Sequence, residues 1–133
     1  MTEYVLYAHN NSYAMTTHLL LEELKLSYRV VWFNVHKPQE FPPEFLTLNP
    51  YGRVPLLVTP DGPLSESAAT MVYLAEKEGG NFLPSDVGQN RAQAFQWLFF
   101  LMSTFQPEVL IQFDPQKYFP NDHHYQVIFL CYN

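Results

Sequence analysis

Cysteine is almost absent from this sequence. The 133 residues contain one cysteine, Cys131, so neither an internal disulfide framework nor a Cys-x-x-Cys redox pair is present. Basic residues are also few, because seven Lys and Arg stand against thirteen Asp and Glu, for a net charge of −6. No run of Lys or Arg could track a phosphate backbone, which argues against nucleic acid as a partner.

Long hydrophobic runs are missing too. The apolar runs are only a few residues long, too short to span a bilayer. The first residues, Met1 to Tyr4, lack the basic start and apolar stretch of a secretory signal, so we expect a cytoplasmic protein without membrane association. Hydrophobic residues make up 47% of the chain, enough for one packed domain, or for a small domain plus part of another.

The first eighty residues have the element order of a small α/β domain. Strand signals, rich in β-branched and aromatic residues, cover 4–7, 28–34, 55–59 and 63–64. Helical periodicity covers 14–26 and 67–78, and a single helical turn is expected around 44–46. A βαβ unit requires a parallel strand pair and the hairpin adds an antiparallel one. The sequence therefore predicts a mixed four-stranded sheet with two long helices.

The two long helices carry signals at their amino ends. Asn11 or Ser12 is the natural N-cap of the first helix, in which Met15 and Leu19 belong to an apolar row. Ser65 is expected to cap the second helix. Both helices should therefore begin directly after short polar segments.

The rest of the chain predicts helices. Asp86 and Gln89 resemble a capping box that opens a helix over 87–105. This helix is apolar nearly all round, Trp97 included, which indicates burial among several partners. A further helix is expected over 107–113, and no strong element after it. Because few partners remain, we expect either that the apolar helix packs against another subunit or that the chain is a shortened form of something longer.

The chemistry of the chain concentrates in two short segments. A cis peptide bond before proline costs only about 0.5–1 kcal/mol, and Val54–Pro55, which opens a strand beside a glycine-containing loop, is a plausible cis site. Such a bond would turn the Val54 backbone outward to pair with a peptide-like ligand. Glu66 and Ser67 begin a helix, where free amides favour a ligand carboxylate and Glu66 can accept a bond from an ammonium. A small peptide with both groups suits this arrangement.

No metal site is expected. His123 and His124 are adjacent, so their side chains tend to point apart, and no second pair of ligands stands near them.

These segments resemble a known family. Asn-Pro-x-Gly-x-Val-Pro, followed by Glu-Ser and an Ala-rich helix that ends Tyr-Leu-Ala-Glu, is similar to the glutathione S-transferase superfamily, in its serine-type, bacterial-like form. The resemblance spans residues 3 to about 113. It implies a thioredoxin-like glutathione-binding domain over 1–80, a linker over 81–85 and a partial, truncated all-α domain over 86–133.

The resemblance also implies roles for individual residues. Val54, followed by a cis Pro55, would pair with the cysteinyl backbone of glutathione, and Glu66 and Ser67 would hold its γ-glutamyl end. The residues expected at the rest of the tripeptide are Arg53 and, near the glycyl carboxylate, Lys37.

The thiol-activating residue is expected at the start of the first helix. Ser12 is the first choice, because Asn-Ser before this helix matches the serine-type arrangement, and Asn11 and Tyr13 are the neighbouring alternatives. A free thiol has a pKa near 8.5 and must drop by about two units, or about 2.7 kcal/mol, to be mostly thiolate at neutral pH. A hydroxyl donor at a helix N-terminus can contribute to that shift.

Three functions stay open on the sequence. The first is a homodimeric transferase of detoxification that attacks a small, apolar electrophile with glutathione as co-substrate. The second is a glutathione-dependent disulfide reductase, and the third is a non-catalytic interaction module or fragment of this fold. The resemblance implies that the electrophile pocket draws on the second domain, so the sequence argues better for glutathione recognition than for turnover.

Overall fold

The computed structural model describes residues 4–113 and residue 118. The chain divides into two compact units, Met1–Val87 and Gly88–Asn133. Each unit is described by itself below.

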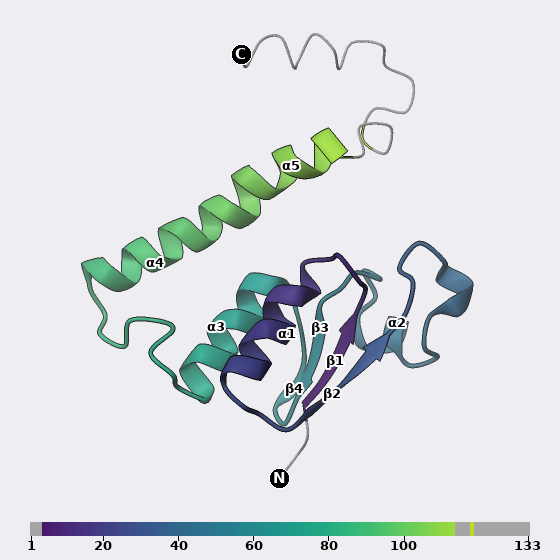
Figure 1. The fold of residues 1–133 in the computed structure, drawn as a ribbon, viewed down its shortest axis with the longest axis horizontal. Coiled ribbons are helices and arrows are strands. Elements are labelled where there is room, and N and C mark those ends of the chain that lie inside the picture. Colours follow the sequence, from purple (N-terminus) through teal and green to yellow (C-terminus); the bar gives the residue numbers. More distant parts are fainter. Residues whose placement is uncertain (1–3, 114–117, 119–133) are drawn as a thin grey trace, which may run out of the picture. The chain divides into compact units, whose positions relative to one another are not determined.

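The first unit is built on a four-stranded sheet (Figure 1). Its strands lie in the order β2-β1-β3-β4, where β1 is Tyr4–Ala8, β2 is Tyr28–Trp32, β3 is Leu56–Thr59 and β4 is Gly62–Ser65. β1 and β2 are parallel, whereas β3 is antiparallel to both β1 and β4. The predicted mixed sheet is confirmed.

Two long helices and two short ones complete this unit. α1, Ala14–Glu23, and α3, Ser67–Lys77, lie side by side against the same face of the sheet (Figure 1). A 3-10 turn, Pro38–Glu40, and the one-turn helix α2, Phe45–Leu48, fall in the connection between β2 and β3. After α3 the chain turns at Gly79 and Gly80, which both have positive φ angles, of 83° and 93°.

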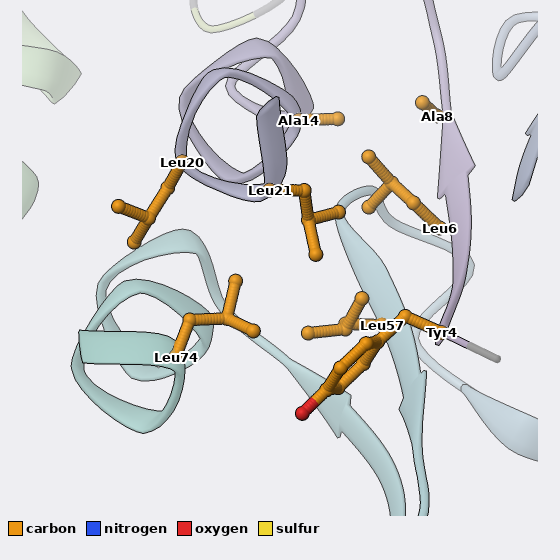
Figure 2. Packing of buried hydrophobic residues seen from close by; sticks show 8 residues of the cluster. All are labelled: Tyr4, Leu6, Ala8, Ala14, Leu20, Leu21, Leu57 and Leu74. Atoms are coloured by element: carbon orange, nitrogen blue, oxygen red, sulfur yellow. The ribbon is translucent and has the colours of Figure 1, made fainter. Parts of the chain in front are cut away.

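The main core lies between the sheet and the two long helices. Figure 2 shows Leu21 of α1 and Leu74 of α3 directed toward Leu6 and Leu57 of the sheet, and all four side chains are fully buried. The α1 face that joins this core carries Ala14, Thr17, Leu20 and Leu21. Met15 and Leu19, which the sequence placed in an apolar row, are 42% and 63% exposed. The helix was therefore predicted, but the apolar row of Met15 and Leu19 does not lie on its buried face.

The opposite face of the sheet carries a smaller aromatic core. Alternation along β1 sends Tyr7 to this face, where it packs near the fully buried Phe45 of α2 with ring centroids 5.7 Å apart. Phe33 and Phe41 surround Phe45 at 4.7 and 5.3 Å. These contacts attach the long β2–β3 connection to the sheet.

The second unit is described over 88–113 as one continuous helical run. It comprises α4, Gln89–Phe100, a π-helical segment, Leu101–Phe105, and α5, Gln106–Phe113. The N-cap of α4 is Gly88, two residues after Asp86, so the predicted capping box at Asp86 is wrong. No residue of these three segments is buried among the described residues, and the expected burial against further partners stays a prediction. Its large exposed side chains are Trp97, Phe99, Phe100, Leu101, Phe105 and Phe113.

The segment for which the sequence predicted no strong element, 118–133, lies outside the described residues apart from Tyr118. His123, His124 and Cys131 belong to this segment.

Candidate functional site

The strand registers bring three chain segments to one end of the sheet. Tyr7 of β1 lies opposite Leu56 of β3, and Leu56 lies opposite Ser65 of β4. The chain therefore leaves β1, enters β3 and leaves β4 at the same sheet end. The predicted site residues in these segments are Ser12, Val54, Pro55, Glu66 and Ser67.

Ser12 lies in the segment that follows β1. Its Oγ donates to the His9 carbonyl at 2.6 Å and accepts from the Ala14 amide at 3.3 Å. The residue is half-buried and precedes Tyr13, the N-cap of α1, at the positive end of that helix. A Ser12 hydroxyl that stabilises a thiolate must therefore turn its proton away from the His9 carbonyl.

The alternatives to Ser12 occupy different environments. Asn11 is exposed and has a φ of 56°, a left-handed conformation that asparagine tolerates better than most residues. Tyr13, with an αR backbone, takes the N-cap position that the sequence assigned to Asn11 or Ser12. The N-cap prediction is wrong because α1 begins at Ala14, one residue later than a cap at Ser12 requires, although the Ser12 Oγ still accepts from the Ala14 amide at the start of the helix.

Val54 leaves its backbone available at the entrance to β3. The Val54–Pro55 peptide bond is cis, and β3 begins only at Leu56. Within residues 4–113 neither the N–H nor the C=O of Val54 has a hydrogen-bond partner. Its side chain, in contrast, packs against both hydrophobic clusters, and Pro55 is buried. A fixed backbone with an open donor and acceptor suits pairing with an extended ligand.

Asn49 holds the loop that presents Val54, a role that sequence reasoning missed. It is only 3% exposed, and its Nδ2 donates to the Arg53 carbonyl at 2.7 Å. The Asn49 carbonyl accepts from the Gly52 amide at 3.0 Å, and Gly52 has a φ of 65° that favours glycine. The Arg53 side chain is exposed. The Asn-Pro-x-Gly spacing was the available signal, because it combines a turn residue with a glycine two positions after the proline.

Glu66 and Ser67 form the third segment. Glu66 is the N-cap of α3 with φ 71° and ψ 120°, so the prediction that Ser65 caps this helix is wrong. A glutamate at positive φ is uncommon, and such strained residues cluster at ligand sites. Its side chain is exposed, whereas Ser67 is 5% exposed and opens the 11-residue helix. The first-turn amides of α3 therefore lie beside a carboxylate and a hydroxyl.

Lys37 reaches the same sheet end by another path. β2 runs parallel to β1, with Trp32 beside Ala8, so the connection that carries Lys37 leaves the sheet where β1 does. The Lys37 Nζ is 2.9 Å from a Glu40 carboxylate oxygen, and both side chains are about half exposed. A ligand carboxylate would have to compete with Glu40 for this ammonium.

Tyr7 is a second residue that sequence reasoning did not single out. Its hydroxyl donates to a Glu44 carboxylate oxygen at 2.5 Å, on the sheet face opposite α1. Burial, reinforced by this hydrogen bond, raises the pKa of Tyr7 to about 12, and the same bond lowers the pKa of Glu44. Tyr7 therefore ties α2 to the sheet and does not direct its hydroxyl toward Ser12.

The described part of the chain has neither a metal-ion cluster nor a membrane-spanning helix. Residues 4–113 and 118 contain no group of three or more His, Cys, Asp or Glu side chains placed to hold a metal ion. No helix in this part of the chain has the length and apolar character needed to cross a membrane.

Comparison with known proteins gives consistent matches. A family model described as "Glutathione S-transferase, N-terminal domain" matches residues 2–76. The disulfide-bond oxidoreductase YfcG of Escherichia coli (strain K12) is 43% identical over 88 residues, which are 61% of this chain and 40% of that protein. Glutathione S-transferase F10 of Arabidopsis thaliana is 34% identical over 110 residues, 77% of this chain and 51% of that one.

Solved structures agree with these matches. The structure of Ure2p in complex with glutathione superposes with a TM-score of 0.70 at 29% identity, over 79% of this chain and 51% of that chain. The chain thus spans about half the length of the relatives it matches.

Proposed function

Because the chain belongs to the glutathione S-transferase family, we propose that its sheet end binds glutathione and offers the glutathione thiolate to a small electrophilic substrate. One observation carries this proposal. The open Val54 backbone and the amino ends of α1 and α3 all follow or precede strand residues at the same end of the sheet. Together they offer backbone and helix-end groups that can pair with the polar groups of a γ-glutamyl peptide.

Each part of the tripeptide has a proposed partner. The Val54 N–H and C=O pair with the cysteinyl backbone as a short added strand. The Ser67 hydroxyl and the first-turn amides of α3 donate to the γ-glutamyl carboxylate, and Glu66 accepts from its ammonium. Arg53, exposed beside Val54, and Lys37, released from Glu40, contact the glycyl end.

Ser12 is the proposed thiol-activating residue. Its hydroxyl, turned from the His9 carbonyl, donates to the glutathione sulfur, and the positive end of α1 favours the thiolate further. Lowering the thiol pKa by about two units requires about 2.7 kcal/mol, which a charge-assisted hydrogen bond plus a helix end can supply. The thiolate then forms a carbon–sulfur bond with an apolar electrophile, and the leaving group departs with its electron pair.

Disulfide reduction is the second candidate. The relative with 43% identity is named a disulfide-bond oxidoreductase, which supports this reading. The chain has a single cysteine, at position 131, so no neighbouring pair of protein thiols exists and two glutathione molecules would supply the electrons. The thiolate held at Ser12 would attack a disulfide sulfur in place of a carbon electrophile.

Two assays on the purified chain distinguish these activities. Conjugation of an aryl halide and reduction of a mixed disulfide are measured alongside glutathione binding by calorimetry. We expect Ser12→Ala to retain glutathione binding but to raise the pKa of the bound thiol, read from thiolate absorbance. Ser27→Ala is the matched control, because the exposed Ser27 lies at the opposite end of the sheet, where its carbonyl accepts from Tyr4. Absence of glutathione binding by the unmodified chain would overturn the proposal.

We also propose that the protein acts in the cytoplasm as a homodimer. The exposed aromatic side chains of α4 and the following segment support self-association, because exposed apolar patches of this kind are uncommon on monomers. Sedimentation at several concentrations tests this, and a monomer at all of them would contradict it.

A further inference from the structure

A buried series of hydrogen bonds connects the first turn of α1 with the first turn of α3. Thr17 and Thr70 are both fully buried, and their Oγ1 atoms lie 2.7 Å apart. The Thr70 Oγ1 also donates to the Ser67 carbonyl at 2.8 Å. Because a hydroxyl carries one proton, Thr17 is the donor to Thr70. The Thr17 hydroxyl therefore donates to Thr70, and the Thr70 hydroxyl donates to the Ser67 carbonyl.

This bond is unusual for its surroundings. The core around α1 and α3 is built mostly from aliphatic side chains such as Leu20, Leu21 and Leu74 (Figure 2). A hydroxyl buried among them is unfavourable unless it is hydrogen-bonded. Apolar contacts permit two helices to slide by small amounts, whereas a hydrogen bond requires a narrow range of distance and angle. The threonine pair therefore fixes the spacing of α1 and α3 in a way that a leucine pair would not.

The bond also lies directly behind the proposed ligand contacts. Thr17 comes four residues after Tyr13, the N-cap of α1, and Thr70 comes four residues after Glu66, the N-cap of α3. Ser12 directly precedes the N-cap of the first of these helices, and Ser67 is the first residue of the second. Neither threonine can touch a ligand, since both are 0% exposed.

We propose that Thr17 and Thr70 are positioning residues that hold the thiol-activating end of α1 at a fixed distance from the carboxylate-binding end of α3. This inference rests on the proposed glutathione site. Glutathione spans both helix ends, so a change in their spacing weakens its γ-glutamyl contacts and its thiolate contact together.

Thr17→Val tests the proposal, because valine has nearly the same shape and lacks the hydroxyl. We expect the Kd for glutathione to rise about tenfold and the pKa of the bound thiol to move toward the value of about 8.5 for a free thiol. Thr17→Ser keeps the donor and should restore both values. Thr59→Val is the matched control, because the Thr59 hydroxyl is also buried and donates to the Gly62 carbonyl at 2.9 Å, but at the opposite end of the sheet.

The outcomes separate positioning from a purely structural role. If Thr17→Val and Thr59→Val lower the Tm by similar amounts and neither changes the Kd or the thiol pKa, the threonines are structural only and the proposal is overturned. Should Thr17→Val fail to fold, Thr17→Ala is measured in the same way. If the unmodified chain does not bind glutathione, the proposed function fails as well, whereas binding that Thr17→Val leaves unchanged refutes this inference alone.

Discussion

The two units of the chain use apolar residues in different ways. In the unit Met1–Val87, strands and helices bury leucines completely, and every buried hydrophobic side chain in the described residues lies between Tyr4 and Leu74. In the unit Gly88–Asn133, the described helices carry Trp97 at 59% and Phe99 at 61% exposure. Aromatic content therefore does not decide whether a segment forms a core, because burial also requires a second element to pack against.

The two units also differ in the candidate site. Its expected residues all belong to the first unit, from Asn11 to Ser67, and their backbone geometry depends on that unit's sheet registers. Glutathione recognition can therefore be examined through residues of the first unit, with equivalent residues of the second unit as controls.

The largest effect is expected from the core of the first unit. Leu21→Ala removes a fully buried side chain of α1 and should reduce the free energy of unfolding by about 2–5 kcal/mol, measured by urea denaturation. Leu101→Ala is the matched change in the second unit, where the side chain is 43% exposed and the loss should stay below about 1 kcal/mol. Equal losses at the two leucines would remove the distinction between the units.

A smaller effect is expected from the ligand contacts. Glu66→Gln removes the charge that we propose accepts the ligand ammonium, and we expect the Kd for glutathione to rise about tenfold, equivalent to about 1.4 kcal/mol. Glu108→Gln makes the same change on α5 of the second unit and should leave the Kd unchanged. Calorimetric titration measures both, and an equal response to the two variants would argue against a site confined to the first unit.

The smallest effect is expected at the surface of the first unit. The carboxylate of Asp61 accepts from Tyr73 at 2.7 Å and from Lys77 at 2.9 Å, and these bonds, Tyr73 foremost, lower its pKa. Because the folded-state pKa lies below the unfolded value of about 3.9, the contribution to stability is present above about pH 4 and is lost as the pH falls through the folded-state pKa.

Asp61→Asn should therefore lower the Tm slightly at pH 7, and the difference from the unmodified protein should shrink below about pH 4. Thermal melts across this pH range provide the measurement. A difference that grows on acidification would show that the sign of the Asp61 contribution has been misjudged.

Much of the fold followed from local patterns in the sequence. Runs such as Tyr28 to Trp32 and the glycine pair at 79–80 predict strands and a helix end through mechanisms that act within a few residues. The exact helix starts were less accessible, because Glu66 adopts a positive φ angle and Gly88 takes the place expected for Asp86. At Glu66 the start of the helix is set by the end of β4 at Ser65 and not by the preference of glutamate itself.

The segments that meet at the sheet end could be predicted from the sequence, whereas not all of the contacts behind them could. The motif around Val54 and the Glu-Ser pair marked the segments, and the Asn-Pro-x-Gly spacing was a signal for the local bond from Asn49 to Arg53. The Thr17–Thr70 bond, in contrast, is a tertiary contact that no short motif encodes. The pairing of Thr17 with Thr70 spans 53 positions of sequence, beyond the reach of helical periodicity.

The amide of Val54 offers the most direct test of glutathione recognition at the sheet end. Within the described residues this amide has no acceptor, whereas the nearby Gly52 amide bonds to Asn49. Hydrogen exchange of both amides is followed by NMR with and without saturating glutathione. We predict that Val54 exchange slows by about tenfold or more on binding while Gly52 changes little. Unchanged exchange at Val54 in protein that binds glutathione would contradict the account.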